Sequence, residues 1–203
     1  MRSIFLRRLL CAAALCGAAA ATHAEEPATR IGGVSFEPRI QLDGQTLQIN
    51  GAGAFAPLRL FGWIKGYAAA LYLGQRAGSA EQVVAQGGPK RLQMHMLLDV
   101  PVDEFIKAFH KGAERNTPAE QFTQLADRMA RFDAMLRPLG EVKKGDLVNL
   151  DFVPGQGLLF THNGRLLGPA IPGADLYGAL LRCFIGERPV DQRLRAALLG
   201  KPG

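Results

Sequence analysis

GAGAFAPLRLFGWIKGYAAALYL, residues 51–73, is the stretch of sequence that decides the fold. Its second part, from residue 58 onward, is rich in aromatic and apolar residues and predicts two strands, with Gly62 and Gly66 as bend or bulge points. Gly51-Ala52-Gly53 lacks the third glycine and the following helix of a dinucleotide-binding loop, so we interpret it as a tight turn. The stretch therefore predicts part of a β-sheet and not a nucleotide-binding βαβ unit.

Alternating apolar and polar residues predict further strands on both sides of this stretch. They cover residues 39–42, 46–49, 91–98, 147–153 and 158–161. Asp43-Gly44 and Asn163-Gly164 are typical of two-residue hairpin turns. In the strand over residues 91–98, Arg91, Gln93 and His95 alternate with apolar residues, so we expect the two sets on opposite faces of the sheet.

Helical patterns separate the strands. They predict helices over residues 79–86, 101–115, 118–137, 175–185 and 190–199. Residues 117–120 (TPAE) form a capping box with proline at the first helical position. The helix that follows has one apolar stripe, predicted to be core first, with one end over a cleft: Phe122, Leu125, Met129, Phe132 and Leu136. This order of strands and helices, joined by hairpins, indicates an α+β fold with an antiparallel sheet and a layer of helices on one face.

The first 24 residues have the three parts of a secretory signal peptide. Three arginines precede an apolar, alanine-rich run, and Thr22-His23-Ala24 supplies small residues at the cleavage site. The apolar run is shorter than the ~20 residues of a membrane span, although an uncleaved N-terminal anchor is the alternative. We expect cleavage after Ala24 and a single domain over residues 25–203, located in the periplasm or secreted. We expect no stable insertion of the mature chain in a membrane.

The mature chain has a composition that excludes several classes of function. Cleavage removes three arginines and no acid, so the formal net charge falls from +6 to +3, with basic and acidic residues interspersed. No repeat of basic and aromatic residues suggests a nucleic-acid partner. His95, His110 and His162 lack the spacing of metal ligands, and we expect neither a metal nor a cofactor. Cys183 is the remaining cysteine, so no disulfide can form within the mature chain, and we expect a buried structural thiol.

Residues 51–73, together with IGERPVDQRLRAALLG at residues 185–200, resemble the chalcone isomerase family, and most of all its bacterial exported branch. The resemblance covers nearly all of the mature chain and implies a ligand cleft between the sheet and the helices. It places the family's catalytic arginine at Phe55 and two of the family's threonines at Tyr67 and Cys183. It places a family tyrosine close to Phe122. The cleft is therefore expected to be more apolar than that of the enzymes.

The resemblance also shapes the expected function. The loss of one preorganised oxyanion donor typically lowers a rate by ~100- to 1000-fold, so losing the arginine and the tyrosine should leave little catalysis. We expect a non-catalytic binder of a hydrophobic small molecule, fatty-acid-like or aromatic. The candidate ligand-binding residues are Phe55, Trp63, Lys65, Tyr67, Arg91, His95, Phe122, Met129 and Cys183. The alternatives are an isomerase or intramolecular lyase that acts through Tyr67 and Cys183, and an envelope interaction protein with a vestigial cleft and an unknown protein partner.

Overall fold

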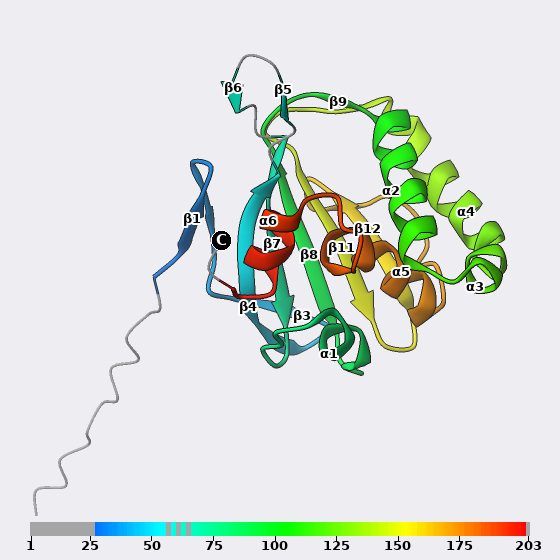
Figure 1. Cartoon of the computed structure of the whole chain (residues 1–203), viewed down its shortest axis with the longest axis horizontal. Helices are drawn as coiled ribbons and strands as arrows, with labels where there is room; N and C mark the ends of the chain where they lie inside the picture. The colour runs from blue at the N-terminus through cyan, green and yellow to red at the C-terminus, as the bar shows by residue number, and fades with distance from the viewer. Residues whose placement is uncertain (1–26, 56–57, 60–61, 64–65, 202–203) are drawn as a thin grey trace, which may run out of the picture.

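The computed structural model describes residues 27–55, 58–59, 62–63 and 66–201. Its centre is a seven-stranded antiparallel sheet with the strand order β13-β12-β11-β8-β7-β4-β3. The strands are β3 (Arg39–Leu42), β4 (Gln45–Phe55), β7 (Tyr67–Leu73), β8 (Lys90–Met96), β11 (Leu147–Val153), β12 (Gly157–His162) and β13 (Arg165–Leu166). The sheet curls and helices pack against one face (Figure 1), which confirms the predicted α+β fold.

Within the described residues, three short antiparallel pairs lie outside the central sheet. They are β1 (Thr29–Ile31) with β2 (Val34–Phe36), β5 (Leu58–Arg59) with β6 (Gly62–Trp63), and β9 (Val100–Pro101) with β10 (Glu141–Val142). The prediction of two strands over residues 58–73 is thus only partly confirmed. β7 joins the central sheet, whereas β5 and β6 pair with each other. Gly66 lies just before β7.

Both predicted hairpin turns are confirmed. Asp43 and Gly44 have φ angles of 51° and 70° between β3 and β4, and Asn163 and Gly164 have φ angles of 50° and 78° between β12 and β13. Two consecutive residues with positive φ define the type I′ turn, whose twist matches that of antiparallel strands. These two dipeptides therefore fix the register at both edges of the sheet.

The predicted tight turn at Gly51-Ala52-Gly53 is wrong, because these residues lie inside β4. The glycines are there for a different reason: helix α6 (Gln192–Leu198) lies directly on the strand. A Cβ atom at Gly51 would lie 2.0 Å from the backbone oxygen of Ala197, and one at Gly53 would lie 2.8 Å from the Ala197 Cβ. The motif thus marks a close approach of helix to strand.

The remaining helices lie on the same side of the sheet as α6 (Figure 1). They are α1 (Ala80–Ala85), α2 (Val102–Asn116), α3 (Ala119–Gln124), α4 (Ala126–Leu136) and α5 (Ala174–Ile185), with a short 3₁₀ helix, η1 (Arg137–Leu139), after α4. The apolar side chains of β8 point towards them, so the predicted alternation of this strand is confirmed. Leu92, Met94 and Met96 are fully buried in the core that the sheet and the helices share.

The single helix predicted from residue 118 to residue 137 is divided into α3 and α4 at Leu125. The predicted capping box does not form, because Pro118 occupies the N-cap position of α3 and no side chain caps it. The Thr117 hydroxyl is buried without a hydrogen-bond partner among the described residues. Four residues of the predicted apolar stripe are buried, while Phe122 on α3 is half-buried.

The face of the sheet opposite the helices carries a second, smaller apolar cluster. Its buried members are Phe36, Leu47, Ile49, Ala68, Ala70 and Tyr72. Phe36 belongs to the β1–β2 pair, so this pair brings an apolar side chain to the second face. The helix layer is therefore not the only cover of the sheet in the described structure.

The predicted signal peptide, residues 1–24, lies outside the described residues. Among the residues that the structure does describe, no helix has the length and the apolar composition needed to cross a membrane.

Candidate functional site

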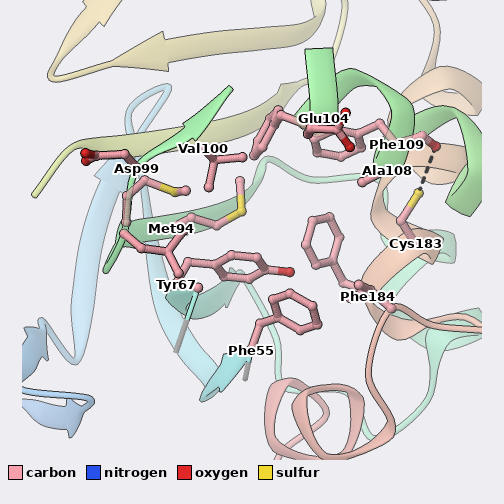
Figure 2. A pocket seen from close by; sticks show the side chains of 15 residues that line it. Phe55, Tyr67, Met94, Asp99, Val100, Glu104, Ala108, Phe109, Cys183 and Phe184 are labelled. Carbon is pink, nitrogen blue, oxygen red and sulfur yellow. Dashed lines mark hydrogen bonds between the residues drawn. The ribbon is translucent and has the colours of Figure 1, made fainter. Parts of the chain in front are cut away.

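A cavity of about 520 Å³ opens between the sheet and helices α2 and α5. This volume lies within the range of small-molecule sites, about 300–1,000 Å³. Figure 2 shows its walls, which come from the ends of β4, β7 and β8 and from the two helices. The lining residues are Phe55, Gly66, Tyr67, Met94, Met96, Leu98, Asp99, Val100, Glu104, Phe105, Ala108, Phe109, Cys183, Phe184 and Val190.

Phe55 and Tyr67 form one wall of this cavity. They are directly paired across β4 and β7, and their rings stack with centroids 5.2 Å apart and planes 27° apart. Gly66 leaves room for the Phe55 ring, because a Cβ atom at Gly66 would lie 3.2 Å from that ring. Phe184 on α5 presents its ring at 71° to Tyr67, with centroids 6.3 Å apart. The phenol ring is thus held between two other aromatic rings.

The Tyr67 hydroxyl is the polar group that the sheet contributes to the interior of the cavity. Figure 2 shows it pointing away from β7 towards Phe184. Burial, and to a lesser degree the neighbouring Cys183, raise the pKa of Tyr67 well above its ordinary value. The group therefore remains protonated and can donate a hydrogen bond.

Cys183 faces the cavity from α5, but its thiol is already engaged. Its Sγ lies 3.5 Å from the carbonyl oxygens of both Phe109 and Ala179 (Figure 2 draws the first contact). A Cβ atom at Gly112 would lie 2.6 Å from this sulfur, so α2 and α5 meet tightly here. Burial raises the pKa of Cys183 to about 12. A thiol in this state packs as a small apolar group and is a poor nucleophile.

The charged residues of the lining lie at its rim and are acidic. An oxygen of Asp99 accepts a hydrogen bond of 2.7 Å from the backbone N–H of Lys144. Glu104 accepts one of 2.7 Å from Lys107, with both side chains exposed. The described lining residues include no lysine, arginine or histidine. The described part of the cavity therefore has apolar walls, one inner hydroxyl and two acidic side chains at its rim, one of them paired with Lys107.

The structure brings three of the predicted site residues together in this cavity: Phe55, Tyr67 and Cys183. Lys65 lies outside the described residues, and the structure describes only the backbone of Trp63. The other four predicted residues lie elsewhere.

Arg91 and His95 are on the opposite face of the sheet. The apolar residues of β8 face the helices, so strand alternation directs these two side chains away from the cavity. Arg91 forms a two-pronged ion pair with Asp151 on β11, at 2.7 and 2.6 Å. The His95 ring meets the edge of Phe36, with centroids 5.2 Å apart. The structure therefore places neither Arg91 nor His95, the predicted partners of a ligand head group, in the lining of this cavity.

Phe122 and Met129 are not among the lining residues either. Met129 is buried in the core, and α4 packs through Phe132 against Phe109 of α2 and Phe160 of β12. The suggestion that one end of this stripe covers the cleft is thus also corrected, because the cavity is covered by α2. Phe105 and Phe109, four residues apart on α2, are among the lining residues that sequence reasoning missed. Their helical spacing was the available signal.

Comparison with known proteins places this geometry in context. The crystal structure of the Arabidopsis thaliana fatty-acid binding protein AtFAP1 is similar to this chain, with a TM-score of 0.63 and 17% sequence identity. The match covers 82% of this chain and 92% of that chain, and at this identity it shows a common fold. No curated protein sequence matches the chain. The family model described as chalcone isomerase-like matches residues 28–200, nearly the whole chain, and the protein therefore belongs to the chalcone isomerase-like family.

Proposed function

We propose that this protein is a non-catalytic binder of a hydrophobic small molecule, which occupies the cavity between the sheet and α2. The observation that carries the proposal is the combination of a cavity of about 520 Å³ with walls of aromatic, methionine and aliphatic side chains. An apolar cleft with few polar groups is the usual form of a small-molecule site. Fatty-acid-like and aromatic molecules are the classes that such walls accommodate.

The fold of AtFAP1, which is described as a fatty-acid binding protein, supports a hydrophobic ligand for this scaffold. The position at which the family resemblance places the catalytic arginine is Phe55, whose ring stacks on Tyr67. An aromatic pair in this position adds contact area for a ligand and supplies no positive charge. This substitution favours binding over the polarisation of a carbonyl by a cation.

The two hydroxyl or thiol groups of the cavity also favour binding over catalysis. Tyr67 and Cys183 both have raised pKa values, so neither is disposed to act as a base or a nucleophile near neutral pH. Cys183 donates to backbone carbonyls. An isomerase or intramolecular lyase would need another group to move a proton.

We further propose that the protein is exported, as in the bacterial exported branch of the family that its sequence resembles. The support is the order of charged, apolar and small residues over residues 1–24. N-terminal sequencing of the mature protein from a periplasmic extract should begin at Glu25. A retained Met1 in the membrane fraction would refute both cleavage and a periplasmic location.

Native mass spectrometry before and after denaturing extraction tests the binding proposal. We expect a discrete small molecule to be released, and we expect the purified protein to bind the neutral dye Nile red. Ala108 is exposed and lines the cavity, so Ala108→Trp should obstruct it and weaken Nile red binding. Ala134→Trp, at an exposed position of α4 that does not line the cavity, is the matched control.

An empty protein that binds no acyl, aromatic or dye probe would refute the proposal. Turnover of a chalcone-like substrate that is lost in Tyr67→Phe would instead support the isomerase alternative. If the full chain captures a protein partner and shows neither a bound ligand nor turnover, the interaction alternative is supported.

A further inference from the structure

A second cavity, of about 300 Å³, lies at the other end of β8 from the first. Its walls come from the start of β8, the end of β11, the last turn of α1 and one side of α5. Lys90 begins β8 here, whereas Met96 at the far end of the same strand lines the first cavity. The two cavities share none of their described lining residues, so a ligand in one would not occupy the other.

We infer that this second cavity binds a small organic carboxylate, whose anionic group pairs with the Lys90 ammonium and whose apolar body packs on Phe152 and Tyr177. The inference goes beyond the proposed function and does not rest on it, because the two sites are separate. It adds an anion site to a scaffold whose first cavity has no cation in its described lining. Three features of the second cavity lead to it.

The first feature is the position of the Lys90 ammonium. Lys90 is only 3% exposed, and the alternation of β8 places its side chain on the helix face of the sheet, as it does Leu92. Its Nζ donates hydrogen bonds to the carbonyl oxygens of Gln86 and Gly88, the second at 3.1 Å. An ammonium group has three N–H donors, so one is left without an acceptor among the described residues. Because Lys90 lines the cavity, a ligand there can supply that acceptor.

The second feature is the lack of a compensating negative charge. Lys90 is the one charged side chain in the described lining, and within the described residues no carboxylate pairs with it. Burial lowers the pKa of Lys90, and no described acidic residue opposes this effect. The Asp175 carboxylate, next to Ala174 of the lining, is held instead by Arg128. A buried cation is costly unless an anion accompanies it, so an anionic group that enters the cavity offsets that cost.

The third feature is the character of the walls. The rings of Phe152 and Tyr177 lie with their centroids 5.4 Å apart, and Val84 and Leu181 add aliphatic side chains to the same lining. The Tyr177 hydroxyl donates to the carbonyl oxygen of Leu150 at 3.4 Å and is therefore already used. The walls thus accommodate an apolar body, and the ammonium is the charged contact that they offer it.

Charge and volume narrow the class of ligand. One cation in an apolar cavity matches one negative charge, which a carboxylate carries. A phosphate monoester carries about −1.5 to −2 charges at pH 7, so part of its charge would stay unpaired. A cavity of about 300 Å³ has the volume of roughly ten water molecules, at about 30 Å³ each. Phenylacetate, with about ten non-hydrogen atoms, is therefore a suitable probe.

Isothermal titration calorimetry of the purified protein at pH 7 compares phenylacetate with phenylacetamide, which has the same shape and no charge. We expect phenylacetate to bind at least about tenfold more tightly, because one hydrogen bond to a charged group changes affinity by about 10- to 150-fold. Lys90→Met should weaken phenylacetate by a factor in that range and leave phenylacetamide unchanged.

Two blocking variants locate the bound phenylacetate. Ala85 is exposed and lines the second cavity, so Ala85→Trp should weaken phenylacetate binding and leave Nile red binding unchanged. Ala108→Trp, which obstructs the first cavity, should do the reverse. Ala134→Trp, which lines neither cavity, should change neither affinity. These variants keep Lys90 in place, so they test the site even if Lys90→Met does not fold.

Phenylacetamide that binds as tightly as phenylacetate would overturn the inference, and Lys90 would then only hold the chain that follows α1. The inference also fails if phenylacetate does not bind, or if Ala85→Trp leaves its binding unchanged. Each of these results leaves the proposed function intact, because that function is tested separately by the binding of Nile red and by the released small molecule.

Discussion

Arg91→Met separates a structural role of Arg91 from a role in ligand binding. Arg91 and Asp151 face each other across β8 and β11, and their paired contacts measure 2.7 and 2.6 Å. The exposed fractions of their side chains are 18% and 4%. Breaking a buried ion pair from one side costs roughly 3–5 kcal/mol, because the remaining charge is left without its partner. The incomplete burial of Arg91 puts the expected cost near the lower end, about 3 kcal/mol.

Urea unfolding at pH 7 measures this cost. The double variant Arg91→Met with Asp151→Leu is the control, and it should be within about 1 kcal/mol of the wild type because no charge remains unpaired. A cost below about 1 kcal/mol for Arg91→Met alone, which is typical of an exposed pair, would refute the reasoning. Since Arg91 lies on the face opposite the cavity, Arg91→Met should not change the affinity for Nile red. A weaker affinity would indicate that Arg91 contributes to ligand binding.

The pH dependence of the same variant gives a second check. Burial raises the pKa of Asp151, and the hydrogen bonds and charge of Arg91 oppose this. Without Arg91, the pKa of Asp151 should rise further. A carboxyl whose pKa is higher in the folded state stabilises the fold when protonated and loses that contribution as the pH rises. The loss in free energy of unfolding caused by Arg91→Met should therefore be largest at neutral pH and smaller in acid. A loss that does not change with pH would contradict a buried ion pair between Arg91 and Asp151.

Three further predictions concern the fold and the cavity. Gly51→Ala would place a Cβ atom 2.0 Å from a backbone oxygen of α6, so it should lower the free energy of unfolding by at least about 2 kcal/mol, whereas Gly87→Ala, with open space around it, should not. Cys183, with a pKa of about 12, should react with a thiol reagent in urea but barely in the native protein, and rapid native reaction would refute its burial. Burial alone would raise the pKa of the Asp146 carboxyl. Its hydrogen bonds, that with Asn163 the strongest, outweigh burial and lower the pKa to about 2. The stabilisation from Asp146 should then be lost as the pH falls from about 4 to about 2, and Asp146→Asn should abolish this part of the acid titration.

Most of the fold could be predicted because its signals are local. Asp43-Gly44 and Asn163-Gly164 define hairpins by backbone chemistry alone, and the alternation of β8 correctly assigned its two faces. The interpretation of Gly51-Ala52-Gly53 failed because the reason for these glycines is not local. α6, which lies about 140 residues later in the chain, needs the space that a Cβ atom would fill. The division of α3 from α4 at Leu125 was likewise not visible in the sequence, since the apolar periodicity continues across that residue.

The candidate site was predictable in part for the same reason. The family resemblance supplied Phe55, Tyr67 and Cys183, and the structure brings these three together. Arg91 and His95 were attractive as polar groups near a cleft, but alternation had already placed them opposite Met94 and Met96. A sequence pattern assigns side chains to two faces without stating which face the cavity occupies. That choice depends on where α2 and α5 pack.

The pairing of Phe55 with Tyr67 is the point at which the cavity wall differs from the arrangement that the family resemblance implies. The two residues are opposite each other on β4 and β7, so the positions are set by the register of the sheet. The resemblance places a cation at the first position in the family's enzymes, whereas this chain stacks a ring there. The neighbouring Tyr67 hydroxyl lines the same cavity, and burial raises its pKa, so it stays protonated. A cation attracts anions over several ångströms, but a neutral donor acts only on an acceptor within hydrogen-bond reach. Under the proposed binding function, the exchange at Phe55 therefore removes one charged contact and adds an aromatic one.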